Sequence, residues 1–255
     1  MEFASKLFQK LTMTTEGNAL PKLIPVSDSA LLIEFENCIS TEISNQVLAL
    51  KSAIEKVSIS GVQECVAGYR SLLVHYDCLQ LPLAQLEKEL QPLLENNQSL
   101  ELEFKTWRVP VLYRGEAAID LDEVAKLHDL TTDEVVRLHK ESDFRVFMVG
   151  FAPGWCYLGG LDPKLATPRL DSPRLTVPKG CISIGGQQGM IGGQAMPSGW
   201  RLLGQTPVQT YAPKRKPPFF IEVGDRIQFY EVNKRDFDQM QKAADRGEFV
   251  AQEVG

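Results

Sequence analysis

The sequence contains only three histidines, His75, His128 and His139, and they form no cluster along the chain. It also lacks a P-loop, a G-x-S-x-G nucleophile elbow and an H-E-x-x-H pair. These are the simplest signatures of nucleotide-binding proteins, serine hydrolases and zinc proteases. The sequence therefore gives no reason to place any of these three kinds of site on this chain.

The five cysteines form no C-x-x-C pair, and their number is odd. Neither a zinc site nor a disulfide framework is expected. Isolated thiols among apolar neighbours behave as small hydrophobic side chains and are typical of a reducing compartment. We expect a cytoplasmic protein with no metal site.

Long apolar runs and an excess of basic residues are both missing. The net charge is −6, and the one short basic run, residues 214–216, lies between two prolines, as is typical of a solvated turn. No run is long and apolar enough for a membrane span, and residues 1–19 lack the apolar stretch of a signal peptide. We expect no nucleic-acid partner, no membrane partner and a flexible N-terminus.

Residues 20–99 alternate between strand and helix patterns. Two β-rich runs, LIPVSD and ALLIEFE, precede a helix that begins near Ser40. Apolar residues recur along that helix at spacings of three and four, which places them on one face: Ile43, Val47, Leu50, Ile54 and Val57. Two more β-rich runs, VQECVAGY and SLLVHYD, and a helix over residues 82–94 follow. We expect an α+β domain with helices on one face of a sheet.

The polar residues 96–99 predict the boundary to a second domain, residues 100–255. A long alternating strand leads to two short helices, one near Leu121–Leu127 behind Asp120 as its cap, and one whose T-T-D-E start predicts a capping box. From Phe144 onward the pattern is mostly β. The run PFFIEVGDRIQFYEV predicts two strands joined by a tight turn, before a peripheral helix around residues 234–246. Pattern alone indicates a barrel or a sandwich.

Glycine and proline are concentrated in residues 147–207. Glycine permits positive φ and close backbone approach, whereas proline fixes φ and removes a donor, so this spacing predicts short strands between tightly specified turns. Loops of this kind commonly build binding surfaces on a rigid scaffold.

Five stretches of the chain resemble the Kip-type kinase inhibitor family, whose members are also described as the B subunit of 5-oxoprolinase or as allophanate hydrolase subunit 1. They are VPVLYRGEAAIDLDEVA, DEVVRLH, FMVGFAPGWCYLGGL, TPRLDSPRLTVPKGCISIGG and PSGWRLLGQTP. The resemblance implies a cyclophilin-like β-barrel over residues 100–255, preceded by a small ferredoxin-like α+β domain over residues 20–99.

The resemblance also implies a function. The chain would be the B subunit of an ATP-dependent 5-oxoprolinase, in which a sister barrel protein (the C-type subunit) and an A-type subunit help to hydrolyse 5-oxo-L-proline, a cyclic amide, to L-glutamate. ATP would be used by the assembled complex, with no cofactor bound by this chain and no activity in the isolated chain. Two alternatives stay open: a regulatory protein that inhibits a histidine kinase through an apolar patch near Tyr211, Phe219 and Phe220, and a carboxyltransferase or allophanate hydrolase subunit.

The resemblance selects Glu116 and His139 as candidate catalytic residues for proton transfer. The alternatives are an ordinary exposed loop acid for Glu116 and, for His139, a favourable position at a helix C-terminus. Cys156 is not expected to be catalytic, because no histidine adjoins it in sequence.

The implied substrate-binding residues come from the two glycine-rich blocks: Phe151, Gly154, Tyr157, Gln188, Trp200, Arg201 and Thr206. Aromatic rings would enclose a small ring, Gln188 would pair with an amide, and Arg201 would pair with a carboxylate. The alternative is that the aromatics only pack into the barrel. Thr167, Arg169 and Arg174 are expected at strand edges and partner contacts.

One loop departs from the family pattern. The family reads Q-T-G-I-Y-P-x-x-S-P-G-G-W, where this chain has QGMIGGQAMPSGW. The departure predicts a loop of different shape or a different ligand.

Overall fold

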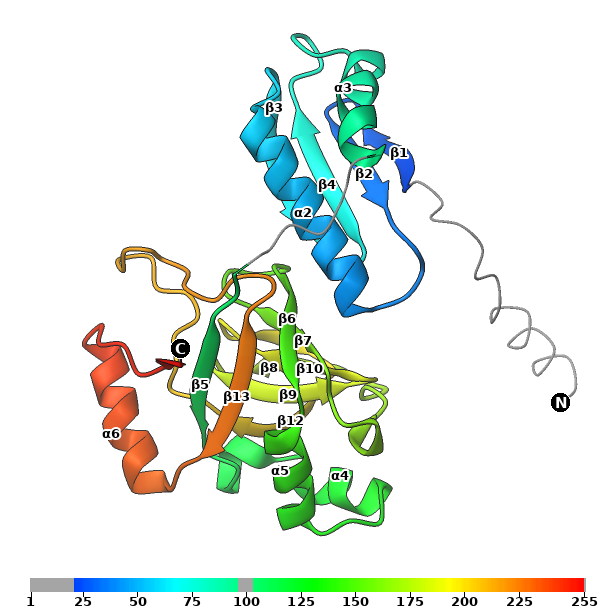
Figure 1. The fold of residues 1–255 in the computed structure, drawn as a ribbon. Helices are drawn as coiled ribbons and strands as arrows, with labels where there is room; N and C mark the ends of the chain where they lie inside the picture. The colour runs from blue at the N-terminus through cyan, green and yellow to red at the C-terminus, as the bar shows by residue number, and fades with distance from the viewer. Residues whose placement is uncertain (1–20, 96–102, 255) are drawn as a thin grey trace, which may run out of the picture.

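The computed structural model describes residues 21–95 and 103–254, which form two units (Figure 1). The N-terminal unit, residues 21–95, and the C-terminal unit, residues 103–254, have separate sheets and separate hydrophobic clusters. The expected boundary at residues 96–99 and the expected flexible start at residues 1–19 lie outside the described residues.

The N-terminal unit is a four-stranded antiparallel sheet in the order β1-β2-β4-β3, with two helices that contact each other. Its elements are β1 (Lys22–Ser27), β2 (Ala30–Glu34), α2 (Thr41–Val57), β3 (Val62–Ala67), β4 (Ser71–Tyr76) and α3 (Leu83–Glu95). Helix α2 begins where the sequence predicts, because the Ser40 hydroxyl accepts a hydrogen bond from the Ile43 amide at 3.1 Å. Buried residues of α2, α3 and the sheet form a single cluster, which confirms the expected α+β arrangement of this unit.

The C-terminal unit is mostly β. Its strands are β5 (Thr106–Val111), β6 (Phe144–Val149), β7 (Cys156–Gly159), β8 (Arg174–Val177), β9 (Cys181–Gly185), β10 (Gln188–Ile191), β11 (Met196–Ser198), β12 (Arg201–Gln205), β13 (Arg226–Glu231) and β14 (Gln252–Val254). Its helices are α4 (Leu121–Leu127), α5 (Thr132–Glu141) and α6 (Lys234–Asp245), with short 3-10 turns η1 (Gly115–Ala118) and η2 (Pro163–Leu165).

Eight of these strands form one sheet in the order β12-β9-β10-β7-β6-β13-β5-β14, and β8 pairs with β11 in a separate ribbon. The main core lies between one face of the sheet and helices α4 and α5. An isolated bridge connects Leu112, which follows β5, with Gln205 of β12. It therefore joins the sheet near its two ends. The mixed, mostly β architecture agrees with expectation, but a closed cyclophilin-like barrel is not confirmed.

Two local predictions are wrong. Asp120 does not cap α4 with its side chain; its buried carboxylate instead accepts from Arg174 at 2.6 Å and from the Leu202 amide at 2.7 Å. The run before β13 is not a strand either: Phe219 forms only an isolated bridge with Tyr211, and the successive residues Phe220 and Ile221 are both buried in the main core. Strand β13 pairs with β5 in parallel and with β6, so it has no hairpin partner in that run.

The two units contact each other through β6. The Arg145 guanidinium donates from Nη2 to Oδ1 of Asn45 on α2 at 2.6 Å, and the Phe147 ring stacks on Tyr69 in the turn between β3 and β4. Arg145 is almost fully buried, which lowers its pKa, and it lies over the rings of Phe104 and Phe147. These contacts bring a turn of the N-terminal unit to the face of the C-terminal sheet that is turned away from the main core.

Candidate functional site

On the outer face of the sheet, opposite the main core, two glycines leave room for aromatic rings. A Cβ on Gly159 would lie 2.5 Å from the Phe147 ring, and a Cβ on Gly185 would lie 2.7 Å from the Trp200 ring. Since real Cβ atoms do not approach other heavy atoms this closely, only glycine lets the two rings lie flat on β7 and β9. The face therefore carries two aromatic walls.

Gln188 lies between these walls. It pairs with Gly185 in the β9–β10 ladder, and the next residue, Gly189, pairs with Leu158 in the β7–β10 ladder. Because directly paired residues in an antiparallel ladder point to the same face, the Gln188 side chain shares the face of Gly185 and Trp200. Gln188 and Phe147 also line a cleft of about 420 Å³ that reaches the start of α2. The side-chain amide of Gln188 therefore lies at the edge of this cleft.

Tyr157 and Trp200 complete the same face. Their rings meet edge to face, with centroids 5.8 Å apart, and Tyr157 is half-buried. The Arg169 guanidinium lies over the Trp200 ring at 5.3 Å from its centroid. Burial raises the pKa of the Tyr157 phenol, and the positive charge of Arg169 opposes this shift. Tyr157 is accordingly a neutral hydrogen-bond donor beside a cation.

Tyr69 reaches this face from the N-terminal unit. Its ring stacks on Phe147, with centroids 5.5 Å apart and planes 8° apart. Burial raises the pKa of its phenol strongly, the neighbouring Tyr157 adds to that shift, and Arg169 opposes it. The Tyr69 hydroxyl is buried and has no hydrogen-bond partner among the described residues. We call the group of residues gathered here the aromatic site: Tyr69, Phe147, Tyr157, Arg169, Gln188 and Trp200.

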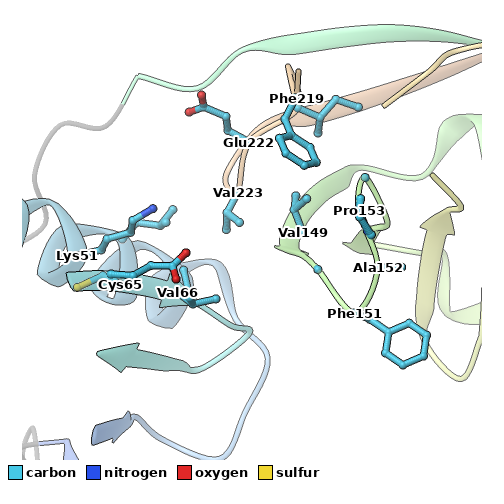
Figure 2. Close-up of a pocket in the computed structure, with 16 residues that line it drawn as sticks. Lys51, Cys65, Val66, Val149, Phe151, Ala152, Pro153, Phe219, Glu222 and Val223 are labelled. Atoms are coloured by element: carbon cyan, nitrogen blue, oxygen red, sulfur yellow. The ribbon is translucent and has the colours of Figure 1, made fainter. Parts of the chain in front are cut away.

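Phe151 and Gly154 belong to a different place, the loop that lines a cleft of about 740 Å³ between the two units (Figure 2). Gly154 has φ +76°, and a Cβ there would lie 2.6 Å from Tyr211. Phe151, three-quarters exposed, points away from the cleft in Figure 2. The cleft also contains Cys65, whose pKa is raised to about 11, chiefly by burial. A thiol shifted this way is not activated as a nucleophile.

The two candidate catalytic residues are placed very differently. Glu116 is exposed on η1, which packs beside β12. His139 is fully buried between Phe144 and Phe229, and burial lowers its pKa to about 3. Its Nδ1 lies 2.8 Å from the Tyr113 hydroxyl, and its Nε2 is buried without a partner among the residues described. This environment holds the imidazole neutral and favours a structural role in the core.

Arg201 and Thr206 are also turned into the protein. Arg201 forms an ion pair with Glu123 at 2.7 Å and donates from Nε to the Pro168 carbonyl at 3.3 Å. Thr206 is buried and its hydroxyl accepts from the Val208 amide at 3.2 Å. Of the seven expected substrate-binding residues, the structure brings together Tyr157, Gln188 and Trp200.

Three members of the aromatic site were not expected there: Tyr69, Phe147 and Arg169. For Arg169 a partial signal existed: Trp200 and Arg201 are neighbours around the start of a strand, so their side chains point to opposite faces and Arg201 does not lie beside the Trp200 ring. Tyr69 and Phe147 carry no such signal, because their meeting depends on how the two units contact each other.

Other kinds of site are not found in the described part of the chain. Over residues 21–95 and 103–254, no group of three or more histidine, cysteine, aspartate or glutamate side chains is arranged to hold a metal ion. No helix within these same ranges has the length and apolar character needed to cross a membrane.

Comparison with known proteins places the chain in a class. Residues 21–221 match the family described as carboxyltransferase domain, subdomain C and D. The fold agrees: the crystal structure of Kluyveromyces lactis urea carboxylase superposes with a TM-score of 0.78 over 96% of this chain and 25% of that one, at 20% identity. The crystal structure of TTHA0988 superposes with a TM-score of 0.71 over 80% of this chain at 32% identity, and this chain spans 40% of that longer one.

Similarity to individual proteins shows which members of this family the chain resembles. The chain is 32% identical to the 5-oxoprolinase B subunit of Bacillus subtilis (strain 168), over 83% of this chain and 93% of that protein. It is 33% identical to the 5-oxoprolinase B subunit of Escherichia coli O157:H7, over 80% of this chain and 93% of that protein. The chain belongs to the carboxyltransferase subdomain C and D family, among the members that are B subunits of 5-oxoprolinase.

Proposed function

We propose that this chain is the B subunit of an ATP-dependent 5-oxoprolinase and contributes, with partner subunits, to the hydrolysis of 5-oxo-L-proline to L-glutamate. The observation that carries the proposal is the 31–33% identity to three proteins named as 5-oxoprolinase B subunits, each aligned over 93–96% of its own length. The cyclophilin-like description of the C-terminal unit and a cytoplasmic location belong to the same proposal.

The aromatic site supports this assignment by its chemistry. A small cyclic amide presents one N–H, one carbonyl oxygen and a compact apolar ring. Gln188 can donate to the carbonyl and accept from the N–H, while the half-buried Tyr157 ring offers an apolar surface to the lactam. An amide is too stable to open readily with water, so ATP would activate its carbonyl, and the residues of this site would hold the ring during that step.

Partner subunits are part of the proposal. Urea amidolyase of Lachancea kluyveri matches this chain over only 15% of its own length, and TTHA0988 is a chain more than twice as long as the matched part. Such longer relatives support an arrangement in which a sister barrel protein of the C type and an A-type subunit act with this chain. Glu116 would be a proton-transfer residue toward such an interface, because its carboxylate is exposed and available to a partner.

The regulatory alternative has less support from the geometry. Of the three aromatics in its expected apolar patch, Phe220 is buried against Trp107, and Tyr211 stacks on Phe219. A continuous exposed patch is therefore not formed by these three rings.

The test is ATP-dependent conversion of 5-oxo-L-proline to glutamate in extracts of the source organism, before and after deletion of the gene for this chain. We expect activity to disappear on deletion and to return when the wild-type gene is restored. A restored Glu116→Gln gene with near-normal turnover would remove Glu116 from the mechanism. Unchanged activity after deletion would overturn the proposed function.

A further inference from the structure

Arg169 is a cation without an anionic partner in the described chain. No ion pair or hydrogen bond to a described carboxylate is formed by its guanidinium, which lies instead over the Trp200 ring. Other arginines on this side of the molecule are paired: Arg174 with Asp120, and Arg201 with Glu123. An unpaired guanidinium on an aromatic face is arranged to receive a planar anion from solution.

The positive charge of Arg169 influences two phenols. Arg169 acts electrostatically on both Tyr69 and Tyr157, and no described carboxylate contributes to the pKa shift of either phenol. Both phenols are protonated at neutral pH, since an ordinary phenol has a pKa near 10 and burial raises the pKa of each further. Their hydroxyls are therefore donors, and the Tyr69 hydroxyl has no acceptor among the residues described. A buried donor without an acceptor is costly, so the site favours a ligand that supplies one.

We propose that Arg169, Tyr69 and Tyr157 form a carboxylate-binding subsite at the edge of the aromatic site. The inference rests on the proposed function for the identity of the ligand, 5-oxo-L-proline. Its carboxylate pairs with the Arg169 guanidinium and accepts from the two phenols, while its lactam lies between the Tyr157 ring and the Gln188 amide. Arg201, the arginine expected from sequence to hold this carboxylate, is already paired with Glu123.

The subsite spans the two units. Tyr69 is held in place by stacking on Phe147, and Arg145 of the same strand donates to Asn45. The carboxylate therefore contacts both units at once, and the N-terminal unit becomes part of the binding site. Removing only the Tyr69 hydroxyl tests this, because Tyr69→Phe keeps the stacked ring.

The experiment is isothermal titration calorimetry of the full chain with 5-oxo-L-proline and with 2-pyrrolidone, the same lactam without a carboxylate. We expect Arg169→Gln to weaken 5-oxo-L-proline binding by about ten- to a hundredfold, the effect of losing one charge-assisted contact, and to leave 2-pyrrolidone binding unchanged. Tyr69→Phe and Tyr157→Phe each weaken 5-oxo-L-proline binding by about three- to tenfold. Arg235→Gln, which removes an exposed arginine from α6, is the matched control and changes neither titration.

The carboxylate subsite is overturned if Arg169→Gln leaves 5-oxo-L-proline affinity unchanged, if it weakens 2-pyrrolidone to the same extent, or if no small carboxylate binds the full chain. A parallel titration with glutarate separates this inference from the proposed function. Glutarate binding that depends on Arg169, together with no binding of 5-oxo-L-proline, supports the carboxylate subsite and contradicts the oxoprolinase substrate.

Discussion

The ring of Tyr69 lies parallel to the ring of Phe147, with 5.5 Å between centroids and 8° between planes. Tyr69 is in the turn that joins β3 to β4, and Phe147 is in β6, so this pair links the two sheets of the molecule. Phe147 can occupy this position because Gly159 beneath it has no side chain. One aromatic pair thus positions the contribution of the N-terminal unit to the site.

The Tyr69–Phe147 pair is expected to contribute energy beyond the burial of each ring alone. In a double-mutant cycle of Tyr69→Ala and Phe147→Ala, we expect a coupling of about 0.5–1.5 kcal/mol in the free energy of unfolding, measured by urea titration. Pairing Phe147→Ala with Phe249→Ala is the control, because Phe249 packs on Trp107 and Phe220 instead. Additive effects in the first cycle would contradict the proposed link.

His139 predicts a pH dependence of stability. Its folded pKa is about 3 because of burial, whereas an unfolded histidine titrates near its usual 6.5. Between these values the unfolded chain binds more protons, so stability is lost as the pH falls from about 6.5 toward about 3, by up to about 1.4 kcal/mol per pH unit. Urea titrations from pH 4.5 to 6.5 should show a shallower dependence for His139→Phe than for the wild type.

The control for that series is His75→Gln, which replaces a partly exposed histidine of β4 and should keep the wild-type slope. Equal slopes for His139→Phe and wild type would show that the imidazole is not held neutral in the folded protein.

Sequence reasoning succeeded where structure is local. The start of α2 near Ser40 and the capping box between Thr131 and Glu134 form as predicted, and each depends on a hydrogen bond between residues three apart. It failed where the partner is distant, as for Asp120, whose carboxylate accepts from the Leu202 amide 82 residues away. A local pattern cannot reveal that a capping residue is needed by a remote strand.

Some residues of the aromatic site could be predicted from the sequence, and others could not. Tyr157, Gln188 and Trp200 could be found because they lie in the glycine-rich blocks that form neighbouring strands. Tyr69 could not, because no sequence pattern records the contact between the two units.

Asp120 is expected to be among the most stability-critical acids of the C-terminal unit. It is 3% exposed, and Asp120→Ala would leave Arg174 without its counter-charge and the Leu202 amide without its acceptor. We expect a loss of about 3–5 kcal/mol in the free energy of unfolding, by thermal or urea titration. The exposed neighbour Asp122 is the control, and Asp122→Ala should change stability by under about 0.5 kcal/mol. A small effect at Asp120 would mean that Arg174 finds another partner.

Thiol reactivity should separate the five cysteines into two groups. Cys38 and Cys78 are exposed, whereas Cys65, Cys156 and Cys181 are buried.

Burial raises the pKa of Cys156 to about 12, so its thiolate is scarce at neutral pH. In the native protein at pH 8 we expect a thiol reagent such as DTNB to modify Cys38 and Cys78 within minutes, and the other three only after denaturation. Rapid modification of a third thiol in the native protein would contradict this division.

Burial of the Cys156 thiol also predicts that Cys156→Ala keeps the activity of the assembled enzyme, since a buried protonated thiol cannot act as nucleophile. The small Ala side chain leaves only a small cavity in the core, with a stability loss of about 1 kcal/mol. Turnover of 5-oxo-L-proline within about twofold of wild type is the expected result, with melting temperature measured in parallel. Loss of turnover at unchanged melting temperature would instead place the Cys156 thiol in the chemistry.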